Sequence, residues 1–292
     1  MMFIELLEEI KDAIIERKSK ELDTVIVIFG AEGTGKSMFG LRLGEYLLED
    51  NVLEFDVFNN VVYHSVEFIK IFNRGNQYIL VDEALNLFYS KEHMGNSYIA
   101  KQLFRGRFKL NTLAIVVQNL RWLDPVVREH RARLFVMTDK TAHGYKLLVF
   151  GSDKAKELYY LQRDLGYSKI EKYYKLASHI IEDPEMPSKK TIEKYKLLKE
   201  ANNILGSLLD LVGLSEAKFA KLYIIGGKDE KRETFMGLLF KLVEGDEDKR
   251  KRILNMIGID YSKNKEYYDR VIEILREKYL NTKKDIKRRE AH

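Results

Sequence analysis

The sequence predicts an α/β fold with a mostly parallel sheet in the first half and a smaller all-α domain after it. Residues 25–29 are an apolar run that leads into a glycine-rich stretch and then an amphipathic helix pattern. That order is typical of a buried parallel strand, a tight turn and a crossover helix. After Phe150 the pattern is helical up to Leu280. We therefore expect two domains, 1–150 and 151–292, the second with a basic tail.

The glycine-rich stretch Gly30-Ala-Glu-Gly-Thr-Gly-Lys-Ser37 matches the phosphate-loop pattern G-x-x-x-x-G-K-[ST] in its required context. Its glycines let successive backbone N–H groups face phosphate oxygens, and the following helix N-terminus reinforces them. In this pattern Lys36 contacts the β- and γ-phosphates, and the Ser37 hydroxyl binds Mg²⁺. The predicted ATP-binding residues are Gly30, Ala31, Glu32, Gly33, Thr34, Gly35, Lys36, Ser37 and Met38.

Composition excludes several other classes of protein. The chain has 292 residues, of which 45% are hydrophobic and 33% charged, which is typical of a globular protein. It has no cysteine, which excludes thiolate metal sites, and no apolar run long enough to span a bilayer. We expect a cytoplasmic protein, and the many Lys and Glu residues favour a thermophile. The net charge of +5 permits a nucleic-acid partner without requiring one.

Elements around the loop follow from periodicity. Apolar residues at helical spacing predict a helix over 2–20 that packs on the core. A second strand is expected at 61–64, followed by a short helix over 65–73 with Ser65 as its cap.

The strand at 78–81 ends in Asp82 and Glu83, which is the Walker B arrangement downstream of a phosphate loop. Asp82 is expected to hold Mg²⁺ through water, and Glu83 to act as general base on the attacking water. The adjacent Glu83 favours hydrolysis over a kinase reaction, which needs no water-activating carboxylate. Because no histidine has a partner at metal-ligand spacing, Mg²⁺ is the only metal that the sequence predicts.

The strand at 113–117 ends in Gln118, a polar amide that can sense the γ-phosphate and orient the water. Asp124 and the following proline are the cap and first turn of a short helix. Strands at 134–137 and 145–150 are predicted to form an antiparallel hairpin.

The second half is predicted to hold only helices. Their expected ranges are 153–164, 168–182, 188–211, 215–223, 229–244, 247–257 and 263–280. The basic cluster at 283–289 is either a DNA-contacting or disordered end, or a solubilising terminus.

Together, these motifs resemble the HerA–FtsK superfamily of DNA-pumping ATPases, which includes viral packaging ATPases and the related Zot-like proteins. The resemblance covers about residues 24–150 and rests on the loop, Val81-Asp-Glu-Ala84, Arg105-Gly106-Arg107, Gln118 and Leu123-Asp-Pro-Val-Val-Arg128. It implies a RecA-like sheet and a hexameric ring in which an arginine completes the ATP site of the neighbouring subunit. The candidates for this arginine, the arginine finger, are Arg107 first, Arg105 second, and then Arg128, Arg131 and Arg133.

Three functions are compatible with the motifs. The first is a Mg²⁺-dependent ATPase motor that translocates or packages double-stranded DNA, encoded by an archaeal virus or plasmid. The second is an ATP-dependent regulatory or assembly switch that acts on a protein partner, as in Zot-like proteins. The third is an AAA-type replication initiator, for which no sensor arginine is evident in a helical lid and the 134–150 hairpin has no role.

Overall fold

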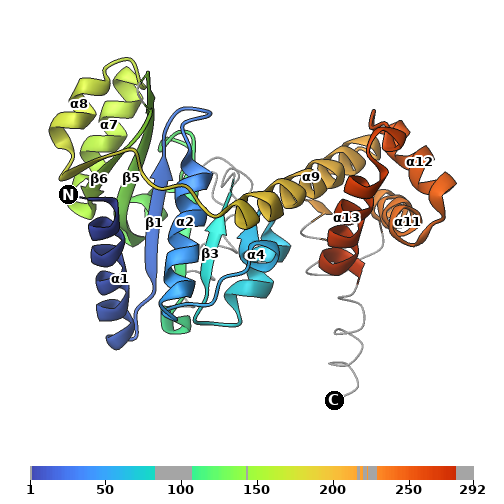
Figure 1. Ribbon diagram of the computed structural model, residues 1–292, viewed down its shortest axis with the longest axis horizontal. Coiled ribbons are helices and arrows are strands. Elements are labelled where there is room, and N and C mark those ends of the chain that lie inside the picture. Colours follow the sequence, from blue (N-terminus) through green and yellow to red (C-terminus); the bar gives the residue numbers. More distant parts are fainter. Residues whose placement is uncertain are drawn as a thin grey trace. The chain divides into compact units, whose positions relative to one another are not determined.

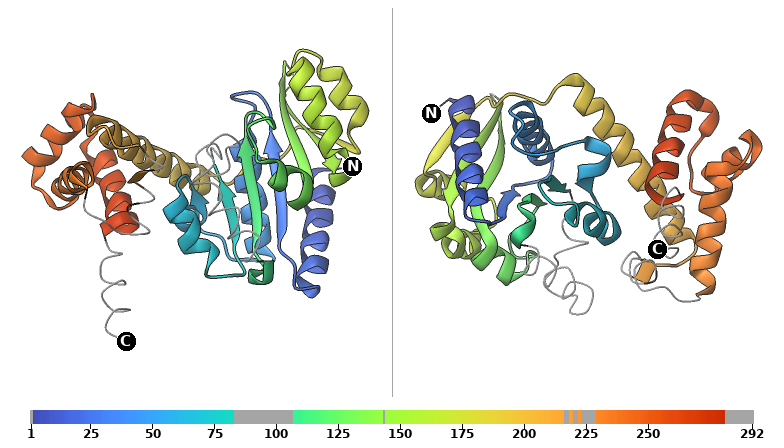
Figure 2. Two further views of the ribbon diagram at one scale, coloured as in Figure 1. Left: turned by 180° about the vertical axis from the view of Figure 1, so that it is seen from behind. Right: turned by 90° about the horizontal axis from the view of Figure 1, so that it is seen from below.

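The computed structural model describes residues 2–82, 107–142, 144–215, 218–219, 222 and 229–280, without the side chains of Val66 and Arg107. These residues divide into two compact units, Met1–Thr191 and Ile192–His292. The first unit contains the sheet and the second contains helices (Figures 1 and 2).

The strands described in the first unit form one seven-stranded sheet in the order β2-β3-β4-β1-β5-β6-β7. Their bounds are β1 (Thr24–Phe29), β2 (Val61–Val62), β3 (Tyr78–Val81), β4 (Thr112–Val117), β5 (Ala132–Thr141), β6 (Gly144–Gly151) and β7 (His179–Glu182). The first five strands pair in parallel, whereas β6 and β7 are antiparallel to their neighbours. This is the RecA-like α/β core that the sequence predicted.

Helices cover both faces of this sheet, as expected for parallel strands that are buried on both sides (Figure 2). On one face lie α1 (Phe3–Ser19) and α2 (Lys36–Glu49), which also contact each other through Phe3 and Phe39. The other face packs on α4 (Ser65–Phe72), α7 (Ala155–Leu165) and α8 (Ile170–Leu176). The central strands β1, β3 and β4 are therefore packed between two layers of helices.

Short elements complete the first unit. They are α3 (Val57–Asn60), η1 (Arg107–Lys109), η2 (Val127–Arg131) and η3 (Ser152–Lys154). Asp124 caps the turn before η2, as predicted, by accepting a hydrogen bond from the Val126 N–H at 2.8 Å. Ser65 is not the cap of α4 but its first helical residue: the cap is His64, one residue earlier, and the Glu67 carboxylate accepts from the N–H groups of Tyr63 and His64.

The boundary between the units differs from the predicted one after residue 150. The helices α7 and α8 bury Leu158 and Tyr173 in the same core as β1, and β7 pairs with β6. The predicted helix over 168–182 was therefore wrong in its second half, where β-branched Ile180 and Ile181 extend the sheet. The boundary at Thr191 falls in the first turn of α9 (Lys189–Leu211).

The second unit is helical, as predicted. Besides α9 it contains α11 (Glu230–Glu244), α12 (Glu247–Met256), η4 (Tyr261–Lys263), α13 (Lys265–Leu275) and η5 (Arg276–Leu280). Its core includes Leu205, Phe235, Leu239, Leu254 and Val271, each essentially inaccessible to solvent. None of the helices described in either unit is long and apolar enough to span a membrane.

Candidate active site

The loop between β1 and α2 is held in one conformation by its own residues and by β5. Gly30 has φ +152°, and a Cβ atom there would lie 2.4 Å from the Thr138 carbonyl oxygen, so only glycine fits. Gly35 is left-handed (φ +90°) and is the N-cap residue of α2. The Thr34 hydroxyl donates to the Ala31 carbonyl at 2.8 Å and lies 2.7 Å from the Thr138 hydroxyl. The chain therefore curls tightly before α2, as a phosphate loop must.

Lys36 extends back over this loop. Its Nζ donates to the carbonyl oxygens of Gly30 at 3.0 Å and Ala31 at 2.6 Å. Burial lowers the pKa of Lys36 below its ordinary value, and the charges of Asp82 and Glu32 partly oppose that shift. The ammonium group thus occupies the concave side of the loop, held by neutral acceptors that a phosphate can replace.

Ser37 and Asp82 meet although 45 residues separate them in the sequence. The Ser37 hydroxyl donates to Oδ1 of Asp82 at 2.8 Å, and the Tyr63 hydroxyl donates to Oδ2 at 3.2 Å. Asp82 is only 2% exposed. Its carboxylate is therefore oriented at the end of β3, directly beside the first turn of α2.

Strand register explains this convergence. The last residue of β1, Phe29, pairs with Val117 of β4, and Val81 of β3 pairs with Ile115. The carboxyl ends of three parallel strands therefore reach the same edge of the sheet, where open α/β sheets bind their ligands. Gln118 follows β4 at this edge and is exposed.

Tyr167, between α7 and α8, is a residue at this edge that the sequence analysis missed. Its hydroxyl donates to the Gln118 carbonyl oxygen at 2.5 Å. Burial raises the pKa of Tyr167 well above its ordinary value, and hydrogen bonding to Gln162 and to the Gly30 backbone partly offsets that shift. Tyr63 and Thr138 were missed as well. None of the three belongs to a motif; each reaches the site only because of how distant segments pack.

Several predicted residues are not tested by this geometry. Glu83 and Arg105 lie outside the described residues, as does the basic cluster at 283–289. Arg107 begins η1, and its side chain also lies outside the description.

Two of the other finger candidates are built into the fold. Arg128 is 4% exposed, donates to the carbonyl oxygens of Leu120 and Leu123, and lies 3.9 Å from the centre of the Tyr159 ring. Arg131 is equally buried and is ion-paired with Asp23. Both guanidinium groups are buried and bonded within this chain, so they do not project toward a neighbouring subunit. The prediction of Arg128 and Arg131 as arginine fingers was therefore wrong. Arg133, at the start of β5, is exposed.

The residues present fit a magnesium ion. Mg²⁺ prefers hard oxygen ligands and is usually held by one or two protein groups together with phosphate oxygens and water. The Ser37 hydroxyl and the Asp82 carboxylate are such ligands, and they lie within 2.8 Å of each other. No group of three or more His, Asp or Glu side chains in the described part of the chain suggests another metal site.

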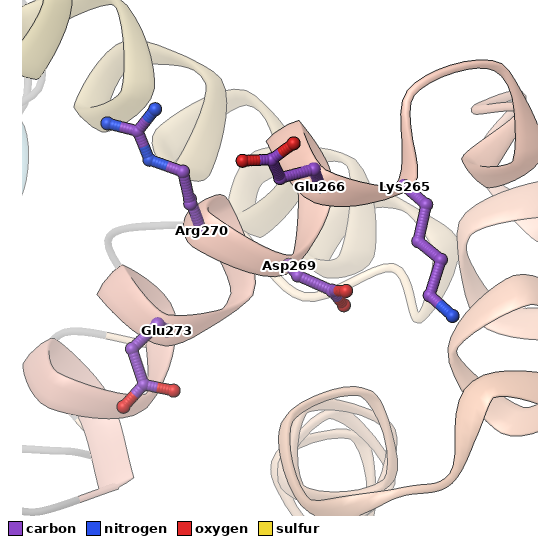
Figure 3. Close-up of a pocket in the computed structure, with 5 residues that line it drawn as sticks. All are labelled: Lys265, Glu266, Asp269, Arg270 and Glu273. Atoms are coloured by element: carbon purple, nitrogen blue, oxygen red, sulfur yellow. The ribbon is translucent and has the colours of Figure 1, made fainter.

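A pocket in the second unit is a weaker candidate for a functional site. It is lined by Lys265, Glu266, Asp269, Arg270 and Glu273, all from α13 (Figure 3). These side chains diverge along one helix, and Asp269 already accepts hydrogen bonds from Arg250 at 3.0 Å and Tyr261 at 2.6 Å. The polar groups at the sheet edge converge instead, so the loop is the candidate site.

No protein-family model and no curated protein sequence matches this chain. Among solved structures, it is similar to the N-terminal domain of zonular occludens toxin from Neisseria meningitidis, with 13% identity, 59% of this chain and 98% of that one covered, and a TM-score of 0.37. It is also similar to the genome packaging NTPase B204 from Sulfolobus turreted icosahedral virus 2 with ATP-gammaS, with 18% identity, coverage of 46% and 94%, and a TM-score of 0.37.

A third similar structure is B204, the DNA-packaging ATPase from Sulfolobus turreted icosahedral virus, with 17% identity, coverage of 55% and 92%, and a TM-score of 0.35. Viral packaging ATPases and Zot-like proteins are among the groups in the superfamily that the sequence resembles, which also includes archaeal and bacterial DNA translocases. Because the TM-scores are below 0.5, we transfer no property of these proteins to this chain. The class of site rests on its own loop, a P-loop suited to a nucleoside triphosphate.

Proposed function

We propose that this chain is a Mg²⁺-dependent ATPase that works as a ring-shaped motor on double-stranded DNA. The observation that supports hydrolysis best is the contact of Ser37 with Asp82 at 2.8 Å, beside Lys36. It joins the ends of the phosphate loop and of the Walker B strand in the arrangement that phosphoryl transfer needs.

The chain's own residues divide the work of the reaction. The backbone N–H groups of residues 30–37 bind the phosphates, and Lys36 exchanges the carbonyls of Gly30 and Ala31 for phosphate oxygens. Ser37 and Asp82 hold Mg²⁺, which when bound neutralises charge on the β- and γ-phosphates. Tyr63 keeps the Asp82 carboxylate in place. Glu83 accepts a proton from the attacking water, and Gln118 orients that water.

DNA as the substrate and the ring as the working form rest on the sequence resemblance and not on the geometry. In that arrangement Arg107 or Arg105 enters the site of the next subunit and stabilises charge on the transferred phosphoryl group. The net charge of +5 is compatible with a DNA partner.

The test is steady-state ATP hydrolysis with and without long duplex DNA, for the wild type and for Glu83→Gln. We expect DNA to stimulate hydrolysis, the stimulation to fall steeply with salt because phosphate contacts release counterions, and Glu83→Gln to abolish turnover while ATP still binds. Arg163→Ala is the matched control for the arginine variants Arg105→Ala and Arg107→Ala, because Arg163 is an exposed arginine on α7 that is not among the candidates for the shared site.

Each other outcome changes the proposal in a defined way. Hydrolysis that is indifferent to DNA would replace the motor with a switch that acts on a protein partner. A wild type that binds no ATP would overturn the proposal altogether. Arginine variants that are inactive alone but regain hydrolysis when mixed with Glu83→Gln subunits would show that the site is shared between subunits.

A further inference from the structure

The β5–β6 hairpin continues past the phosphate loop. β1 pairs with β5 only as far as Phe29 and Met137, whereas β5 and β6 go on pairing to Thr141 and Gly144. Residues 138–141 and 144–147 therefore extend beyond the end of β1, alongside the loop. The sequence predicts this hairpin but gives it no role.

Alternate residues of the extension face the loop. Side chains directly opposite each other in an antiparallel pair share a face, and so do residues two apart along a strand. Thr138, whose hydroxyl contacts Thr34, is thus on the same face as Lys140, and Lys140 is paired with Tyr145. The Lys140 Nζ lies 5.8 Å from the centre of the Tyr145 ring.

The Tyr145 ring lies beside the loop, at Gly35. A Cβ atom at Gly35 would lie 3.4 Å from Cδ1 and 3.6 Å from Cε1 of the Tyr145 ring, which is ordinary van der Waals contact. The Tyr145 backbone is fixed because its carbonyl oxygen accepts a hydrogen bond from the Asp183 N–H at 2.9 Å. The ring remains partly exposed beside the N-terminus of α2.

The direction in which a nucleotide lies follows from the ligands of its phosphates. Ser37, Lys36 and Asp82 mark the terminal phosphates, and Asp82 ends β3, beyond β4 on one side of β1. The nucleoside must leave the loop on the opposite side of β1, where β5 and β6 lie. Tyr145 is an aromatic side chain that lies beside the loop on that side.

We propose that Tyr145 is the wall of the nucleoside subsite and that its ring stacks on the base of the bound nucleotide. The proposal rests on the proposed function, because it needs a nucleoside triphosphate on the loop. Stacking uses the face of the base, which every base has, so this contact distinguishes a nucleotide from bare polyphosphate rather than ATP from GTP. Lys140 adds a cation at the rim of the same subsite.

The experiment compares two probes that share the triphosphate and differ in the nucleoside. Calorimetric titration with ATPγS and with inorganic tripolyphosphate, both with Mg²⁺, is carried out on the wild type, Tyr145→Ala, Tyr145→Phe and Tyr160→Ala. Tyr160 is 50% exposed on α7 and its ring contacts Arg163, so it is a matched surface tyrosine. Thermal unfolding of each variant is measured alongside.

We expect Tyr145→Ala to weaken ATPγS binding about tenfold and to leave tripolyphosphate binding within about twofold. Tyr145→Phe and Tyr160→Ala should bind both probes as the wild type does. Unchanged ATPγS affinity in Tyr145→Ala would overturn the proposal, and so would an equal loss of both probes, which would mean that the ring only supports the loop. A wild type that binds neither probe would instead overturn the proposed function.

Discussion

The two edges of the sheet use buried polar side chains in opposite ways. At the amino edge, where β1, β3, β4 and β5 begin, polar groups are paired so as to join strands and helices permanently. At the carboxyl edge, where the phosphate loop lies, they hold one another through contacts that a ligand can replace. The same kinds of residue thus stabilise the fold at one edge and prepare the site at the other.

Several buried polar side chains at the amino edge have partners in other elements. Asp23 and Arg131 form an ion pair in which each side chain is only 3% exposed. The amide of Asn111 accepts from the Gln77 N–H at 2.9 Å and donates to the Phe72 carbonyl at 2.9 Å, which ties β4 to β3 and α4. Asn60 donates to the Tyr78 carbonyl at 2.8 Å. These bonds connect elements, so losing one costs stability.

At the carboxyl edge the partners are weaker or local. Lys36 donates only to carbonyls of its own loop, and the pKa of Lys36 is lowered by burial. Ser37 and Asp82 are hydrogen-bonded to each other in the position where a metal ion would separate them. Both edges are polar, so polarity does not distinguish them. What distinguishes the carboxyl edge is that a bound ligand can replace the contacts that its polar side chains make. The predictions below test it from the largest expected effect to the smallest.

The largest effect is expected at the amino edge. Asp23→Ala removes the carboxylate paired with the buried Arg131 guanidinium, and breaking a buried ion pair from one side costs about 3–5 kcal/mol. Urea unfolding measures this loss. The exposed Arg133→Ala should change the free energy of unfolding by less than about 0.5 kcal/mol. If folded Asp23→Ala bound ATPγS much more weakly than the wild type, the two edges would not be independent.

Lys36→Ala should have the reverse profile. Charge-assisted hydrogen bonds to phosphate are lost, so we expect ATPγS affinity to fall about a hundredfold, or about 2.7 kcal/mol. The free energy of unfolding should change by less than about 1 kcal/mol, because Lys36 joins no distant element. Calorimetry and urea unfolding measure the two quantities, with the exposed Lys20→Ala as control. A large loss of stability would contradict the comparison.

Tyr63→Phe should produce a smaller change confined to the metal. It removes the hydrogen bond of 3.2 Å to Asp82 and hardly changes the volume of the side chain. The loss of this hydrogen bond corresponds to about 1 kcal/mol. We expect the Mg²⁺ concentration for half-maximal ATPγS binding to rise about fivefold. Tyr46→Phe, which removes a hydroxyl bonded to Glu8 between α1 and α2, is the control. An unchanged Mg²⁺ requirement would mean that Tyr63 does not position Asp82.

The smallest effect is on pH dependence. Burial lowers the pKa of Lys36 from 10.5, so the free protein loses that proton at a lower pH than an ordinary lysine, while bound phosphate favours the charged form. We expect nucleotide affinity to begin falling at a pH below 10.5 and binding there to take up a proton. Calorimetry in buffers of different ionisation enthalpy measures the proton uptake, which should be absent in Lys36→Ala.

The sequence was sufficient for the elements whose signals are local. The apolar run of β1, the helical period of α2 and the strand ending in Asp82 are each visible within a dozen residues, and each lies where it was predicted. The hairpin was predicted as well, although it is longer than expected, because its outer residues are too polar to be recognised as strand. The strand β7 was taken for a helix because its four residues gain strand conformation only by pairing with β6.

By itself, then, the amino-acid sequence determined the phosphate loop, the α/β class and the helical second unit, because spacing, glycines and periodicity act over short stretches of chain. Only the tertiary structure decided which residues surround that loop. Thr138 and Tyr145 approach it from β5 and β6, Tyr167 from beyond α7, and Arg131 is turned into the core by Asp23. Contacts between segments a hundred residues apart depend on strand order and register, and neither is written in the local pattern.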